Sequence, residues 1–157
     1  MSRAGRALPY AVLLLLAAEG RAALACPGEL VLLARPAGVE LARVGLDGSG
    51  GFALSFRHSV TLRTVVDRYR IEDGKIVQIE QLFDSHGPGL PDAAGADLVF
   101  LREGDRFRVR MQRPIDRLVL RPSRASENRL EAATRLDLAE LGAGPLELVP
   151  VPCSERR

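Results

Sequence analysis

The chain has 157 residues, with 22 basic and 20 acidic side chains, two histidines and two cysteines. Three of the basic residues and one acidic residue fall within the first 25, so residues 26–157 carry 19 of each sign. This balance argues against nucleic acid or an anionic membrane surface as a partner, because both attract proteins with net positive charge.

Residues 1–25 have the layout of a secretory signal. Two arginines precede an apolar run over residues 8–18, and the small residues Ala23 and Ala25 lie just before Cys26. The run is shorter than the roughly 20 apolar residues of a membrane-spanning helix, and no later segment is long enough to span. The sequence therefore predicts a protein exported to the periplasm or beyond, with a single domain over residues 26–157.

Both cysteines belong to the exported part and lie at its two ends. Cys26 precedes an apolar segment over residues 29–34, and Cys153 follows another over residues 145–151. If these segments pair as antiparallel strands, the two cysteines come close, and export favours oxidation, so we expect a disulfide between them. The alternative is a lipoprotein in which Cys26 is the acylated first residue and anchors the protein to a membrane.

The exported part consists of short predicted strands separated by turns. In the segment 52–57, large apolar residues alternate with small or polar ones, as in a half-buried strand. Residues 64–71 and 75–83 flank Asp73-Gly74, a pair that can adopt the positive φ angles of a tight hairpin turn. The other strands predicted in this part are residues 29–34, 39–44, and two runs within 98–112.

The segment 98–112 has two chemically distinct faces. Its apolar residues share one face of the strand and its arginines share the other. The faces consist of Phe107, Val109 and Met111, and of Arg106, Arg108 and Arg110. The arginine row is either an anion-binding platform or a solvated face that neighbouring carboxylates neutralise, and the overall charge balance favours the second interpretation.

Residues 126–144 combine signals for helix and for strand. We expect extended structure near Arg135 and at most one helical turn near Ala139. Together, the short strands and frequent turns predict one all-β domain, built as an antiparallel β-sandwich or a partly closed β-barrel.

An ordered set of motifs extends from residue 52 to residue 91. An aromatic strand ends in HSV, an acidic strand ends in an aromatic residue, a hairpin follows, and the loop HGPGLP comes last. This order resembles the domain-of-unknown-function family eighteen-fifty, a family of small exported bacterial proteins. Val65, Arg68 and His86 depart from the family pattern. The residues that fit it are His58, Ser59, Val60, Thr64, Val66, Asp67, Tyr69, Gly87, Gly89, Leu90 and Pro91.

The resemblance implies a role in transport rather than a known reaction. Members of the family are often encoded beside the permeases of tripartite periplasmic transporters that depend on a solute receptor. The resemblance therefore implies an accessory or binding module whose partner is such a permease, its solute receptor, or a small anionic solute. No cofactor is expected.

The predicted binding residues lie in two segments that the hairpin can bring side by side. Rigid loops on a β scaffold are where binding residues gather. We expect His58 to hydrogen-bond with Asp67, Ser59 to cap the turn, and the loop 86–91 to face them. The full set of predicted binding residues is His58, Ser59, Asp67, Tyr69, His86, Gly87, Gly89 and Leu90.

The same residues leave two chemical alternatives open. A hydrolase would need Ser59 as nucleophile and His86 as base, because a strand that continued through residues 58 and 59 would point His58 away from Ser59. Asp67 or Asp84 would orient that base. A metal-binding protein would use both histidines with one of these aspartates. A non-catalytic module is favoured, since the chain lacks a GxSxG motif and the spacing defines no metal geometry.

Overall fold

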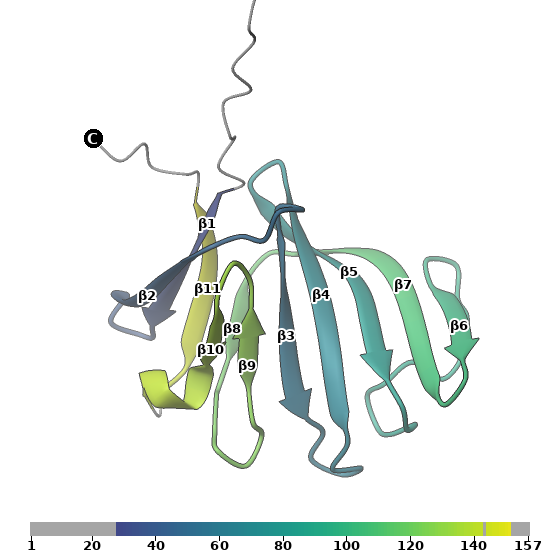
Figure 1. Cartoon of the computed structure of the whole chain (residues 1–157). Helices are drawn as coiled ribbons and strands as arrows, with labels where there is room; N and C mark the ends of the chain where they lie inside the picture. The colour runs from purple at the N-terminus through teal and green to yellow at the C-terminus, as the bar shows by residue number, and fades with distance from the viewer. Residues whose placement is uncertain (1–27, 143, 152–157) are drawn as a thin grey trace, which may run out of the picture.

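The computed structural model describes residues 28–142 and 144–151, and confirms the predicted all-β fold. Eleven strands and one short 3₁₀ helix make up this part of the chain (Figure 1). The strands are β1 (Glu29–Ala34), β2 (Val39–Gly45), β3 (Gly51–Arg57), β4 (Thr64–Glu72), β5 (Lys75–Phe83), β6 (Val99–Glu103), β7 (Arg106–Ile115), β8 (Leu118–Leu120), β9 (Arg129–Glu131), β10 (Arg135–Asp137) and β11 (Leu146–Val151), and the helix is η1 (Leu138–Leu141).

The strands form two antiparallel sheets that pack together as a sandwich. The smaller sheet has the order β2-β1-β11-β8, and the larger one has the order β10-β9-β3-β4-β5-β7-β6 (Figure 1). Most neighbours in the larger sheet are joined by short connections, so β3, β4 and β5 follow one another both in the chain and in space. This meander places the motifs of residues 52–91 on adjacent strands.

The first and last strands of the smaller sheet pair as the sequence predicts. β1 and β11 are antiparallel, with Glu29 opposite Val151 and Ala34 opposite Leu146. Cys26 and Cys153 lie outside the described residues, so the disulfide between them stays a prediction.

Two hydrophobic clusters lie along the inner face of the larger sheet. The first fills the space between the sheets, where Leu30, Leu146 and Leu148 of the smaller sheet meet Phe52 and Tyr69 of the larger one. The second cluster packs under the segment between β5 and β6. It consists of Val65, Phe83, Val109 and Met111, with Leu90 and Leu98 packed against it. The inner face between the two clusters is polar, and the candidate site lies there.

The hairpin and the chain end match their predictions, with two additions. Asp73 and Gly74 have φ angles of 50° and 75° between β4 and β5, as a tight hairpin turn requires. Arg135 is extended in β10, and the single helical turn η1 follows, capped by the Asp137 carboxylate on the Ala139 N–H at 3.0 Å. The three-residue strands β8 and β9 were not predicted, because such short runs show too little alternation.

Among the described residues, no helix is long and apolar enough to cross a membrane.

Candidate functional site

His58 closes the turn that follows β3. The imidazole is only 8% exposed, and its Nδ1 accepts the backbone N–H groups of Val60 and Thr61, each at 3.2 Å. Because Nδ1 accepts, the ring proton lies on Nε2, which donates to the carbonyl oxygen of Pro88 at 3.1 Å. His58 therefore fastens the turn 58–62 to the loop 86–91, and the predicted side-by-side placement of the two segments is confirmed.

The expected hydrogen bond between His58 and Asp67 is wrong. The register of β3 and β4 places Asp67 opposite Leu54, four residues before His58, which corresponds to roughly 13 Å along the sheet. Ser59 lies exposed in the turn. The turn cap expected from its hydroxyl comes from the His58 ring instead.

The loop 86–91 contains a tight turn that fits closely against His58. The Leu90 N–H donates to the Gly87 carbonyl at 3.1 Å, and Gly89 has a φ of 84°, as the third position of a type II turn requires. A Cβ on Gly87 would fall 2.8 Å from Thr61 Cγ2 and 3.0 Å from His58 Cε1. Gly87 and Leu90 therefore form the turn that packs against His58, while Gly89 lines a cavity described below.

His86 makes a different set of contacts from His58. Its ring is exposed and packs on an aromatic group at the end of the sheet, with the Phe107 ring centroid 4.3 Å away. Phe83 and Phe100 complete this group, at 6.0 Å and 6.2 Å from His86. His58 thus holds the loop from outside through Pro88, whereas His86 belongs to the loop and packs it on the phenylalanines.

Asp67 is the centre of a polar group on the inner face of β4, β5 and β7. Along β4, Val65, Asp67 and Tyr69 share this face, so the carboxylate lies between the two hydrophobic clusters. Its Oδ1 accepts the side-chain amides of Gln78 at 3.0 Å and Gln81 at 2.8 Å. The Tyr69 hydroxyl approaches Oδ2 at 3.5 Å.

Gln78 connects this carboxylate to Arg113. The Gln78 side chain is 1% exposed, and its Oε1 accepts a hydrogen bond from Arg113 Nη2 while its Nε2 donates to Asp67. Opposite charges thus stand at the two ends of one amide. Since a guanidinium has five N–H donors, Arg113 keeps donors for a further partner.

Burial changes the acid–base properties of this group. Burial raises the pKa of the Asp67 carboxyl above its ordinary value, against the opposing effects of the Gln81 hydrogen bond and the positive charge of Arg113. Burial and the nearby Asp67 charge also raise the pKa of the Tyr69 hydroxyl, which therefore stays a hydrogen-bond donor. The negative charge of the Asp67 carboxylate therefore lowers the stability of the folded protein, because burial removes much of its hydration.

Two glutamines reach the same carboxylate because β5 contains a bulge. On a regular strand, residues 78 and 81 would point to opposite faces. The pairing of β5 with β7 shifts by one residue between Gln78 and Glu80, which turns both glutamine side chains inward. Strand alternation alone assigns Gln78 and Gln81 to different faces, so sequence reasoning missed them. The signal that was available is the repeated glutamine within an apolar strand.

A cavity of about 440 Å³ opens beside this polar group. Gln78, Gln81 and Arg113 line it on the sheet side, and Gly89 and Asp97 line it on the loop side. Its size falls within the usual range of small-molecule sites. Its remaining lining residues are Pro91, Leu98, Met111, Gln112 and Pro114.

A comparison with protein families identifies the chain. The family model Domain of unknown function (DUF1850) matches residues 52–138, which is more than half of the chain. The chain belongs to the DUF1850 family. No curated protein and no solved structure matches the sequence.

The segment matched by DUF1850 contains the whole candidate site. His58, the loop 86–91 and every cavity residue fall within residues 52–138, whereas β1, β2 and β11 fall outside. Of the predicted residues, the structure brings Asp67, Tyr69 and Gly89 to the cavity or its polar wall. Arg113 and Asp97, which sequence reasoning missed, supply its charges.

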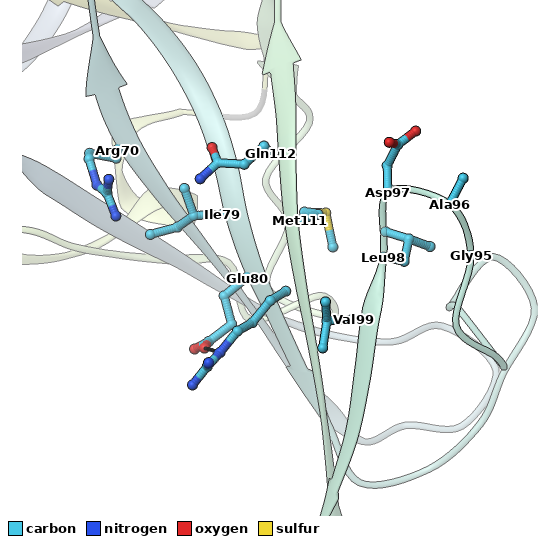
Figure 2. Close-up of a pocket in the computed structure, with 11 residues that line it drawn as sticks. Arg70, Ile79, Glu80, Gly95, Ala96, Asp97, Leu98, Val99, Met111 and Gln112 are labelled. Atoms are coloured by element: carbon cyan, nitrogen blue, oxygen red, sulfur yellow. Dashed lines mark ion pairs between the residues drawn. The ribbon is translucent and has the colours of Figure 1, made fainter.

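The outer face of the same sheet carries the predicted arginine row. Arg108 pairs with Glu103 at 2.8 Å and with Glu80 at 2.6 Å, and Arg110 lies 3.9 Å from Glu80. Neighbouring carboxylates therefore neutralise much of this face of the DUF1850 chain, as favoured from the sequence. A second cavity, of about 670 Å³, lies between Glu80 and the segment that leads into β6 (Figure 2).

The metal-binding alternative finds no matching geometry in residues 28–142 and 144–151. No group of three His, Cys, Asp or Glu side chains converges in this part of the chain. Both nitrogens of His58 are engaged by backbone groups, and His86 packs on phenylalanines. The metal set that combines both histidines with Asp67 is therefore wrong, because the three side chains belong to separate contacts.

Replacing Asp67 with asparagine should stabilise the protein at neutral pH. The folded-state pKa of Asp67 lies above its ordinary value of 3.8, so the folded protein binds this proton more tightly than the unfolded chain does. Wild-type stability therefore falls as the pH rises from 3.8 through the folded-state pKa, and that loss is absent in Asp67→Asn. We expect its melting temperature to exceed that of the wild type at pH 7 and to converge with it in acid.

Asp84→Asn is the matched control, because the pKa of this carboxyl is shifted in the opposite direction and the expected change in melting temperature has the opposite sign. Arg63 donates to the partly exposed Asp84 and lowers the pKa of this carboxyl. Its contribution is present above the ordinary pKa and is lost as the pH falls, so Asp84→Asn should lower the melting temperature slightly at pH 7. An Asp67→Asn variant that melts below the wild type at pH 7 would show that the carboxylate is stabilising as an anion.

Proposed function

We propose that the chain is an exported, non-catalytic module that binds a small solute through a carboxylate, as an accessory of a tripartite uptake system in the periplasm. The observation that carries the binding proposal is the position of Arg113. Its guanidinium is held by the buried Gln78 on one side and lines the 440 Å³ cavity on the other. A guanidinium fixed in this way is pre-organised to bind a carboxylate with paired hydrogen bonds.

The chemistry of the lining supports binding rather than turnover. The polar side chains that line the cavity are three glutamines, one arginine and one aspartate. Amides and guanidinium groups orient a ligand by hydrogen bonds, and they are poor nucleophiles and poor general bases at neutral pH. The apolar residues of the lining supply the remaining contact area that small-molecule sites typically have.

The proposed export of the protein and its proposed transport role are supported by observations other than the cavity. Export is supported by the signal layout of residues 1–25, and the uptake role is supported by the gene context of the family that the sequence resembles. Intact-mass measurement of the exported protein, with and without reductant, tests signal cleavage, acylation of Cys26 and the disulfide with Cys153 together.

Calorimetric titration of the purified exported chain with a panel of small carboxylates tests the binding proposal. We expect at least one carboxylate to bind to the wild type, and Arg113→Gln to weaken that binding by about tenfold to a hundredfold, because a charged hydrogen bond is lost. The control is Arg106→Gln, which removes a positive charge from the opposite face of the same strand. The proposal fails if no carboxylate binds, or if both variants bind equally well.

The uptake role has its own test in the cell. Deleting the gene should reduce uptake of the solute identified by calorimetry, and a tagged chain should recover the permease or the solute receptor. Restoring the gene with Arg106→Gln should rescue uptake, and restoring it with Arg113→Gln should not. Unchanged uptake in the deletion strain, together with no recovered transport component, would contradict the accessory role without affecting the binding proposal.

A further inference from the structure

The cavity beside β7 is lined by two side chains of opposite charge. Arg113 comes from β7, and Asp97 comes from the segment that leads into β6. Within residues 28–142 and 144–151, Arg113 makes one side-chain hydrogen bond, to the uncharged Gln78, and neither charge forms an ion pair. Both charged groups are therefore available to a ligand in the space between them.

The charge behind the cavity opposes an anionic ligand. Asp67 stands at the other end of the Gln78 amide, so its negative charge partly offsets that of Arg113. With Asp97 also lining the cavity, two carboxyl groups and one guanidinium lie in or beside it. A ligand that carries only negative charge would meet repulsion here, whereas a ligand with one charge of each sign would be matched at both ends.

The remaining wall of the cavity is apolar. Pro91 and Leu98 contribute to it from the loop, and Met111 and Pro114 contribute from β7. Such a wall favours a short aliphatic group, since burying apolar surface is the main non-directional contribution to binding.

We propose that the solute is an aliphatic α-amino acid, bound by its carboxylate at Arg113, its ammonium at Asp97 and its side chain against Leu98 and Met111. This proposal rests on the proposed function and specifies the ligand of the same site. The two recognition groups come from separate segments, so the amino acid would join the loop to the sheet.

Calorimetric titration with leucine and two truncated analogues tests the assignment. The analogues are 4-methylpentanoate, which lacks the ammonium group, and 3-methylbutylamine, which lacks the carboxylate. We expect leucine to bind and both analogues to bind at least about tenfold more weakly, because each leaves one charged group of the protein without its partner.

Asp97→Asn separates the ammonium contact from the rest of the site. It should weaken leucine binding by about tenfold without weakening the binding of 4-methylpentanoate, which has no ammonium group and is repelled by the Asp97 carboxylate. Asp92→Asn is the matched control, an exposed aspartate of the same loop that does not line the cavity. Its affinity for leucine should equal that of the wild type.

The outcomes distinguish this inference from the proposed function. If 4-methylpentanoate binds as tightly as leucine, or if Asp97→Asn leaves leucine binding unchanged, the amino acid assignment is wrong while carboxylate binding stands. The same holds if leucine fails to bind and a carboxylate without an α-ammonium group binds through Arg113. If no carboxylate binds at all, the proposed function and this inference both fail.

Discussion

Phe52→Ala should lower the free energy of unfolding by about 3 to 5 kcal/mol, as is typical when a large buried ring is truncated. Phe52 is 2% exposed, lies in the cluster between the two sheets, and stacks on Tyr69 with ring centroids 4.9 Å apart. Removing the ring leaves a cavity at the point where β3 and β4 meet the smaller sheet. Chemical denaturation followed by circular dichroism measures this loss.

The same variant should also disturb the candidate site. Tyr69 carries the hydroxyl that approaches Asp67, and its ring is held on one side by Phe52. We therefore expect Phe52→Ala to weaken solute binding at temperatures where the protein is still folded. Val60→Ala is the control, because Val60 is 66% exposed and its truncation should change stability by less than about 0.5 kcal/mol. A loss below about 1 kcal/mol for Phe52→Ala would contradict the packing between the sheets.

His58→Ala should cost about 2 to 3 kcal/mol and should release the loop 86–91. The substitution removes a buried ring and leaves the N–H groups of Val60 and Thr61 and the carbonyl of Pro88 without their partner. Because Gly89 lies one residue after Pro88 and lines the cavity, solute binding should weaken as well. Thermal melting and calorimetric titration measure the two effects.

Two matched variants separate the parts of this contact. His86→Ala removes the exposed histidine of the same loop and should cost less than about 1 kcal/mol. His58→Asn keeps a side-chain oxygen that can accept the N–H groups of the turn, but it is too short to reach Pro88. It should recover part of the stability but not the affinity. Equal effects of His58→Ala and His86→Ala would contradict the assignment of His58 as the anchor.

Alternation and turn chemistry predicted most of the larger sheet. Phe52 and Leu54 point inward as the period of two requires, and Asp73-Gly74 forms the hairpin turn. These features depend on neighbours in the chain, so they can be read from short stretches. The order of strands and the contact between loop 86–91 and His58 depend on distant residues, and only the motif order around residues 52–91 suggested the latter.

The candidate site was predicted only in part, because its geometry depends on an irregular strand. Asp67 was singled out for its chemistry, but its partner was assigned to His58, the nearest histidine in the predicted turn. The actual partners, Gln78 and Gln81, become neighbours only through the bulge in β5. A pattern that assumes regular alternation cannot place them on one face.

The bulge in β5 also changes which residues of the strand point inward, from the even-numbered positions to the odd-numbered ones. Before it, the inward positions of β5 include Ile76 and Gln78, and after it they include Gln81 and Phe83. Straightening β5 without changing its length would restore regular alternation and move one of the two glutamines to the solvent side, because residues three apart on a regular strand point to opposite faces. The spacing of these glutamines is therefore a signature by which chains that retain this pocket can be told from chains that share only the fold.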